Sequence, residues 1–103
     1  MGKRGPSSIH ASQIPARTAM AIGDRLKYVR LAIGLTQAEF AKSIGSSQGA
    51  CGQYEAGMRR PAIEIGLRIL DRHGVSLDFL YAGNIAKLDY EFAEKLRKAG
   101  FRP

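Results

Sequence analysis

The side chains able to do covalent or metal chemistry in this 103-residue chain are few and far apart. Cys51 is the single cysteine, and neither His10 nor His73 stands at a spacing from it that is typical of a metal site. Three aspartates are scattered over the expected helix surfaces, namely Asp71, Asp78 and Asp89. No serine, histidine and carboxylate grouping indicates a nucleophile. We therefore expect no enzymatic activity, no bound metal and no cofactor.

Other side chains suit recognition rather than catalysis. The amides of Gln48 and Gln53 both donate and accept hydrogen bonds, as pairing with N6 and N7 of adenine requires. Arg59 and Arg60 carry charge that can bind phosphate without reading sequence. Polar surface residues and an ordinary solvated charge pair are the alternative interpretations.

The charge balance favours a polyanionic partner. Lys and Arg number 16 against 9 Asp and Glu, a net charge of +7, and such an excess is typical of proteins that bind nucleic acid or an acidic membrane surface. Residues 1–60 hold nine basic and three acidic side chains, whereas residues 61–103 hold seven and six. The positive charge is therefore concentrated in the first half. One cysteine allows no internal disulfide and no apolar run is long enough to span a bilayer, so we expect a cytoplasmic protein.

The spacing of apolar residues predicts an all-α fold, because no stretch shows sustained strand alternation. Residues 1–20 are predicted to be a flexible basic arm, with Lys3, Arg4 and Arg17 among Gly, Ser and Pro. Such an arm is either an inert tail or a segment that enters the DNA minor groove.

Six helices are expected after the arm. In chain order they run from Ile22 to Gly34, from the cap Thr36 to Gly45, from the cap Ser47 to Ala56, from Pro61 to Gly74, from the cap Ser76 to Tyr81, and from Ile85 to Gly100. Thr36 and Glu39 have the spacing of a capping box. Ile63, Leu67 and Leu70 form the apolar stripe of the fourth helix.

Four strings in this order identify a family resemblance. They are LTQAEFA at 35–41, YEAG at 54–57, RRP at 59–61 and GVSLDFL at 74–80, with Gly45 between the first two. With them, residues 21–84 resemble the lambda-repressor-like, or XRE-type, helix-turn-helix domain. The resemblance implies a five-helix DNA-binding domain whose helix-turn-helix spans residues 37–56, followed by an additional C-terminal helix at 85–103. In that motif one helix crosses the DNA backbone and the next places its first residues against base edges.

The resemblance also implies a role for individual positions. The expected base contacts are Gln48, Gly49 and Gln53. The expected phosphate contacts are Gln37, Ser47, Arg59 and Arg60. Arg30 and Glu55 match a structural salt bridge between the first and third helices. Because Gly49 offers no side-chain donor, base reading would rest on the two glutamines.

The sequence thus predicts a sequence-specific, repressor-like transcription regulator of bacterial or phage type that binds double-stranded operator DNA. Two glutamines discriminate weakly, so we expect a homodimer on half-sites about 34 Å apart. Residues 85–103 either form the dimer interface or dock on their own domain. The alternative function is an antitoxin-type or adaptor protein that acts mainly through a protein partner, such as a toxin.

Overall fold

The structure, a computed structural model, describes residues 15–103, so the expectations about Lys3, Arg4 and His10 concern residues outside this range. Its elements are α1 (Ala19–Ile33), α2 (Gln37–Ser43), α3 (Gln48–Glu55), α4 (Ile63–His73), α5 (Leu77–Ala82), the 3₁₀ turn η3 (Ile85–Lys87) and α6 (Tyr90–Ala99). No strand occurs within 15–103, and the predicted all-α fold is confirmed. None of the helices in this range combines the length and apolar character that a membrane crossing demands.

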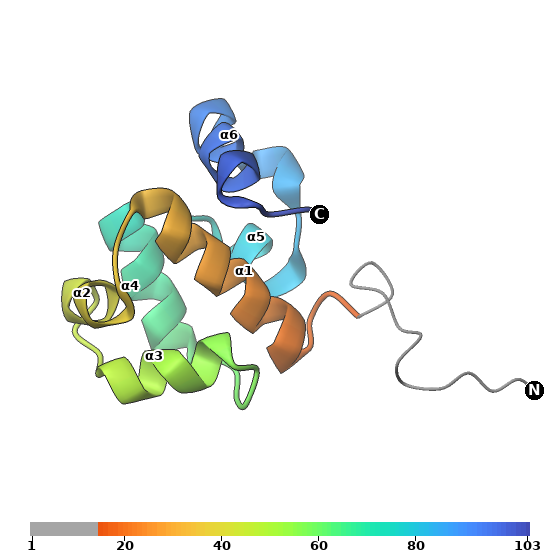
Figure 1. Ribbon diagram of the computed structural model, residues 1–103. Coiled ribbons are helices and arrows are strands. Elements are labelled where there is room, and N and C mark those ends of the chain that lie inside the picture. The colour runs from red at the N-terminus through yellow and green to blue at the C-terminus, as the bar shows by residue number, and fades with distance from the viewer. Residues whose placement is uncertain (1–14) are drawn as a thin grey trace, which may run out of the picture.

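Helix α1 is the scaffold on which the other helices assemble. It runs through the middle of the molecule and contacts α3, α5 and α6 (Figure 1). The side chain of Thr18 caps its first turn by accepting a hydrogen bond from the Ala21 amide. The helix therefore begins at Ala19, inside the range 1–20 that was expected to be a flexible arm. Its buried stripe includes Ile22, Leu26 and Val29.

A glycine lets α1 approach the end of α3. A Cβ atom on Gly23 would overlap the carbonyl oxygen of Tyr54, the penultimate residue of α3. Since every other residue carries a Cβ, only glycine allows the two backbones to lie this close. This contact fixes the end of α3 against the scaffold.

The helix-turn-helix follows the predicted caps closely. Thr36 and Glu39 form both hydrogen bonds of the capping box at the start of α2. Gly45 adopts the left-handed conformation, with φ of 66°, in the turn between α2 and α3. Ser47 then caps α3 by accepting a hydrogen bond from the Ala50 amide at 3.1 Å. These local interactions determine where both helices begin.

The packing of α4 differs from the sequence prediction. The helix begins at Ile63 rather than at Pro61, and its fully buried residues are Gly66 and Ile69. The ring of Tyr81 lies 2.6 Å from the position that a Cβ on Gly66 would occupy, and its hydroxyl donates to the carbonyl oxygens of Pro61 and Ala62. Because Tyr81 fits against the glycine, α4 turns Gly66 inward. Ile63 and Leu67 of the predicted stripe are exposed instead.

The expected sixth helix is divided in two. Asn84 caps the η3 turn, Leu88 is extended, and the carboxylate of Asp89 accepts hydrogen bonds from the amides of Glu91 and Phe92 to start α6. Two capping side chains five residues apart thus start two separate elements.

The apolar side of α6 packs on its own domain. Leu96 is buried against the core, and Phe101 beyond the helix places its ring 5.5 Å from that of Phe79 and 6.0 Å from that of Tyr28. Helix α6 lies against α1 at the end of the molecule opposite α3 (Figure 1). Two roles are expected for residues 85–103, a dimer interface or docking on their own domain. In this structure they dock on their own domain.

A buried arginine joins the start of the domain to α5. Arg25 is 6% exposed, and its guanidinium donates to the carbonyl oxygens of Leu80 and Ala16. Burial lowers the pKa of Arg25 from its usual value, because a low-polarity environment disfavours the charged form. Position 25 lies on the same side of α1 as Ile22 and Leu26, so the helical spacing places this arginine toward the core.

A histidine contact links α4 to α2. The ring of His73 stacks on Phe40 with 5.2 Å between ring centroids, and its Nε2 lies 2.8 Å from the hydroxyl oxygen of Ser43. The same hydroxyl lies 2.6 Å from the carbonyl oxygen of Phe40, so Ser43 contacts both the ring of His73 and the backbone of α2. Burial lowers the pKa of His73, which favours the neutral ring.

Candidate nucleic-acid interface

One side of α3 is exposed and poor in large side chains. Cys51 and Tyr54 face the core, whereas Gln48, Gly49 and Gln53 are exposed. At 3.6 residues per turn, Gln48 and Gln53 lie about 140° apart around the helix, with Gly49 and Gly52 between them. The exposed side is therefore a shallow surface of two glycines flanked by two carboxamides, all presented by one helix. The three residues expected to contact bases share this surface.

A buried carboxylate at the end of α3 is shared with two other helices. Arg30 of α1 donates through Nε to Glu55 at 2.6 Å and through a second nitrogen at 3.1 Å, and Gln37 of α2 donates to the same carboxylate at 3.0 Å. The Arg30 and Glu55 side chains are only 13% and 6% exposed. A further nitrogen of Arg30 donates to the Leu35 carbonyl, just before α2. The carboxylate thus joins α1, α2 and α3, and it is buried where these three helices meet.

The placement of Gln37 explains how α2 and α3 keep their relative positions. Its amide nitrogen is used by Glu55, while its oxygen lies 3.7 Å from where a Cβ on Gly52 would be. The side chain is half-buried between the two helices. It therefore supports α3 directly, and remains beside the exposed side of that helix.

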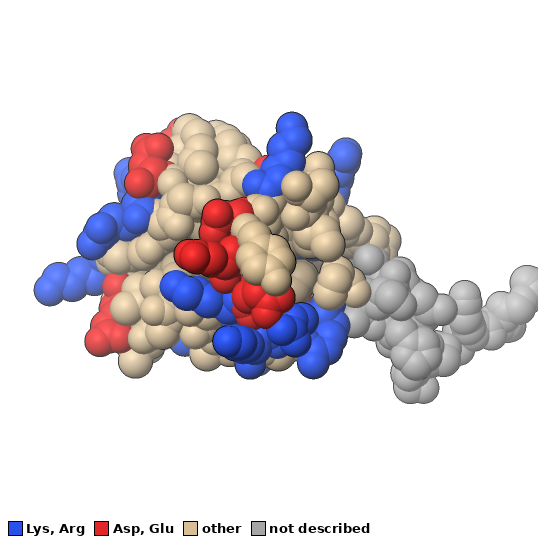
Figure 2. Space-filling model, turned by 90° about the horizontal axis from the view of Figure 1, so that it is seen from above, with Lys and Arg blue, Asp and Glu red and all other residues tan. Residues whose placement is uncertain are grey.

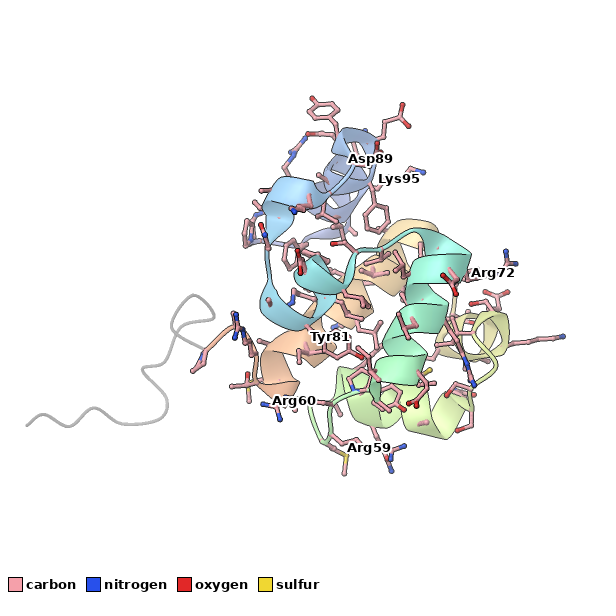
Figure 3. The ribbon with its side chains drawn as sticks, turned by 180° about the vertical axis from the view of Figure 1, so that it is seen from behind. Arg59, Arg60, Arg72, Tyr81, Asp89 and Lys95 are labelled. Atoms are coloured by element: carbon pink, nitrogen blue, oxygen red, sulfur yellow. The ribbon has the colours of Figure 1, made fainter. Side chains whose placement is uncertain are left out.

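Two arginines follow α3 at the same end of the molecule (Figure 3). The guanidinium of Arg59 lies over the ring of Tyr54, 5.2 Å from its centroid, in a cation–π contact. Arg60 donates through Nε to the carbonyl of Arg17 at 2.9 Å, which ties the loop after α3 to the segment before α1. Both side chains are exposed, so their charge is available to a ligand that approaches α3.

Sequence reasoning missed Arg68 of α4. One of its terminal nitrogens lies 3.4 Å from the carbonyl oxygen of Ile44 and 3.3 Å from that of Gly45, in the turn that precedes α3. This places a third positive charge beside the helix-turn-helix. No local pattern could have indicated it, because the contact joins residues more than twenty positions apart.

The charge distribution separates the two ends of the molecule. Around α6, acidic and basic side chains are interspersed among uncharged ones (Figure 2), including the solvent-exposed pair of Glu94 and Arg97. A surface of mixed sign gives little attraction for phosphate. The end that carries α3 has Arg59 and Arg60 beside a helix whose own carboxylate is neutralised internally.

In the described part of the chain, metal-binding side chains do not form clusters and the cysteine is not exposed. Within residues 15–103 no three His, Cys, Asp or Glu side chains lie close enough together to hold a metal ion. Cys51 is fully buried in the core, and this burial raises the pKa of its thiol. A protonated, inaccessible thiol fills space as a small apolar side chain.

Comparison with known proteins agrees with this geometry. A family model described as helix-turn-helix matches residues 26–80. Over 69 residues the chain is 33% identical to an SPbeta prophage-derived uncharacterized HTH-type transcriptional regulator, YonR, of Bacillus subtilis (strain 168). This alignment covers 67% of the chain and 64% of the length of that relative. No solved structure gives a significant match. The chain therefore belongs to the XRE-type helix-turn-helix family, a family of DNA-binding domains.

The shared carboxylate leads to a stability prediction. Replacing Glu55 by Gln keeps the size of the side chain but leaves the half-buried Arg30 without its counter-charge. The free energy of unfolding should fall by about 3 kcal/mol, as for other buried ion pairs that lose one partner. Chemical denaturation monitored by circular dichroism measures the change. The matched control is Glu94→Gln, which removes an exposed carboxylate from its pair with Arg97 and should leave the transition where it is. Equal transitions for the two variants would contradict the role given to Glu55.

Proposed function

We propose that this protein is a sequence-specific DNA-binding transcription regulator, repressor-like in action, that binds operator DNA as a homodimer. The observation that carries the proposal is the exposed side of α3, fixed by Glu55 to both α1 and α2 and followed by two exposed arginines. A helix held this rigidly can enter the major groove at one defined angle.

The proposed contacts divide into two kinds. Gln48 and Gln53 read base edges, and Gly49 lets the helix backbone come close to the groove. The phosphate contacts are Gln37, Ser47, Arg59 and Arg60, which set register and supply affinity that depends on salt. Support for this division comes from exposure, because every residue except the half-buried Gln37 is exposed. The hydroxyl oxygen of Ser47 accepts from the helix, so its proton is still available to a phosphate oxygen.

The small number of base contacts favours two copies on one operator. A bidentate base contact contributes about 1–3 kcal/mol of discrimination, so two glutamines specify only a few base pairs. A second copy on a second half-site doubles the length of sequence that is read.

Selection from a randomised duplex library at physiological salt tests the proposal. We expect the purified protein to enrich a two-fold symmetric motif whose half-sites lie about one helical turn apart. Salt-sensitive binding without any enriched motif would instead exclude sequence-specific regulation, and would favour action through a protein partner.

Base and phosphate contacts should respond differently to substitution. Gln48→Ala should relax the preference at one base pair, at a cost of about 1–3 kcal/mol on the preferred sequence. Arg60→Ala should weaken binding to all sequences alike and reduce the slope of log affinity against log salt by about one unit. Titrations of both variants at several salt concentrations measure these effects. Identical behaviour of the two would disprove the division.

Gly49 should show a conflict between stability and binding. No atom lies within 4 Å of a Cβ built on Gly49, so Gly49→Ala should raise the free energy of unfolding by about 0.5 kcal/mol through helix propensity. The added methyl group should nevertheless weaken DNA binding, because it stands between the two glutamines.

Gly52→Ala is the matched control for this prediction. Its methyl group would lie 3.7 Å from the side-chain oxygen of Gln37, an ordinary contact, and Gly52 is only partly exposed whereas Gly49 is exposed. The variant should therefore gain similar stability and lose less affinity, as thermal unfolding and titration with the selected duplex would show. If both variants bound DNA as well as the unaltered protein, the proposed close approach at Gly49 would be wrong.

A further inference from the structure

A hollow with a volume of about 390 Å³ lies beside the first half of α1. The chain end after α6 lies beside the connection that leads out of α5 (Figure 1), and both contribute to its walls. We call this hollow the α1 pocket. The lining residues that carry charge or shape the pocket include Ala16, Asp24, Arg25, Gly83, Phe101 and Arg102. Its volume falls within the range of small-molecule sites, about 300–1,000 Å³.

Arg25 brings a buried positive charge to the wall of the α1 pocket. The residue is 6% exposed, and its guanidinium donates through Nε to the carbonyl oxygen of Leu80 and through Nη2 to that of Ala16. The other terminal nitrogen, Nη1, donates to none of the described residues. Arg25 is therefore fixed in place by the domain and keeps one donor nitrogen for a ligand.

Gly83 leaves space beside that nitrogen. A Cβ atom built on Gly83 would lie 3.1 Å from Nη1 of Arg25 and 3.6 Å from the Cβ atom of Ala16. These three residues all line the α1 pocket. Because Gly83 lacks a side chain, Nη1 remains open to the pocket instead of being covered by the turn after α5.

The charge of Arg25 has no carboxylate partner among the described residues, although buried charges are normally paired. Its neighbour Asp24 is exposed and forms no salt bridge with it, and Glu55, which also lines the pocket, is paired with Arg30. Burial lowers the pKa of Arg25, while the charge of Asp24 acts in the opposite direction. A carboxylate bound at Nη1 would offset the cost of burying this cation.

The remaining walls suit a ligand with an apolar body. Met20 and Phe101 contribute apolar side chains to the pocket. Arg102 adds a second guanidinium, which is exposed. Its Nη1 donates to the carbonyl oxygens of Arg97 and Phe101, so its other nitrogens can still bind an anion. An inorganic anion would leave the apolar walls unused, whereas an organic acid contacts both kinds of wall.

We propose that the α1 pocket binds a small organic carboxylate. The carboxylate accepts hydrogen bonds from Arg25 and Arg102, and the hydrocarbon body packs on Met20 and Phe101. Asp24 at the same pocket can accept a hydrogen bond from a ligand that also carries an ammonium group, as an amino acid does. The inference is independent of the proposed function, because Gln48, Gly49 and Gln53 do not line this pocket.

Nuclear magnetic resonance of the nitrogen-15-labelled full-length protein tests the proposal. Addition of 4-methylpentanoate should shift the amide resonances of residues 16–25, Gly83 and Phe101, with a dissociation constant of about 1 mM or lower. Acetate has the carboxylate without the apolar body and should bind at least about 10-fold more weakly. The amine 3-methylbutylamine lacks the carboxylate and should cause no shifts. Tighter binding of leucine than of 4-methylpentanoate would identify the ligand as an amino acid, and the reverse order would identify a simple carboxylic acid.

Two substitutions test the assigned contacts. Arg25→Gln removes the buried charge and should weaken binding of 4-methylpentanoate by at least about 10-fold, as expected for a hydrogen bond to a charged group. Because Arg25 also binds two backbone carbonyls, a second variant leaves it in place. Ala16→Leu fills the pocket from an exposed position and should abolish binding. Its matched control is Ala86→Leu, the same change at an exposed alanine of η3 outside the pocket, which should bind like the unaltered protein.

The same spectra show whether each variant folds, so lost binding is separated from lost structure. Absence of shifts with both 4-methylpentanoate and leucine up to about 10 mM would overturn the inference. Shifts centred on another part of the domain, equal binding of 3-methylbutylamine, or unchanged affinity in Ala16→Leu would overturn it too.

Discussion

The carboxylate of Glu55 is the point at which three helices of the domain are joined. It accepts hydrogen bonds from Arg30 of α1 and Gln37 of α2 while belonging to α3 itself. The charges are nearly removed from water, so the pair is costly to break and demands good geometry. Around it, Gly23 allows α1 to reach the end of α3. The orientation of the exposed side of α3 follows from these contacts, and the proposed reading of DNA depends on that orientation.

The exposed side of α3 is held in place although the helix carries few large side chains. Gly49 and Gly52 lower the intrinsic helix propensity of an eight-residue helix, so tertiary contacts must hold it. Those contacts come from Cys51 and Tyr54 in the core, from the Ser47 cap, and from the Glu55 network. What is gained is an unobstructed surface between Gln48 and Gln53. This helix would be unstable in isolation, but the contacts with the rest of the domain hold it. Its small exposed residues then allow a ligand surface to come close.

Helices α4 and α6 have similar apolar spacing, but their apolar residues have different surroundings. Leu96 and Phe101 pack inside the same chain, with Phe101 placed between Tyr28 and Phe79, although their spacing suited an interface equally well. Ile63 and Leu67 of α4 have the spacing of a core-facing side, yet both are exposed. Helical spacing identifies which residues share a side of a helix, but not what that side meets. In α4 the fit of Tyr81 against Gly66 decides it.

The sequence by itself determined the class of fold, the family, and the start of most helices. Caps such as Thr36, Ser47 and Ser76 act within three residues of themselves, so their effect can be recognised locally. Motif spacing also located the residues that share the exposed side of α3. Tertiary structure alone decided which side of α4 is buried, that α6 docks on α1, that Arg25 is buried, and that Arg68 reaches the turn before α3. Each of these depends on contacts between residues distant in sequence, where shape and competing partners, rather than local preference, set the free energy.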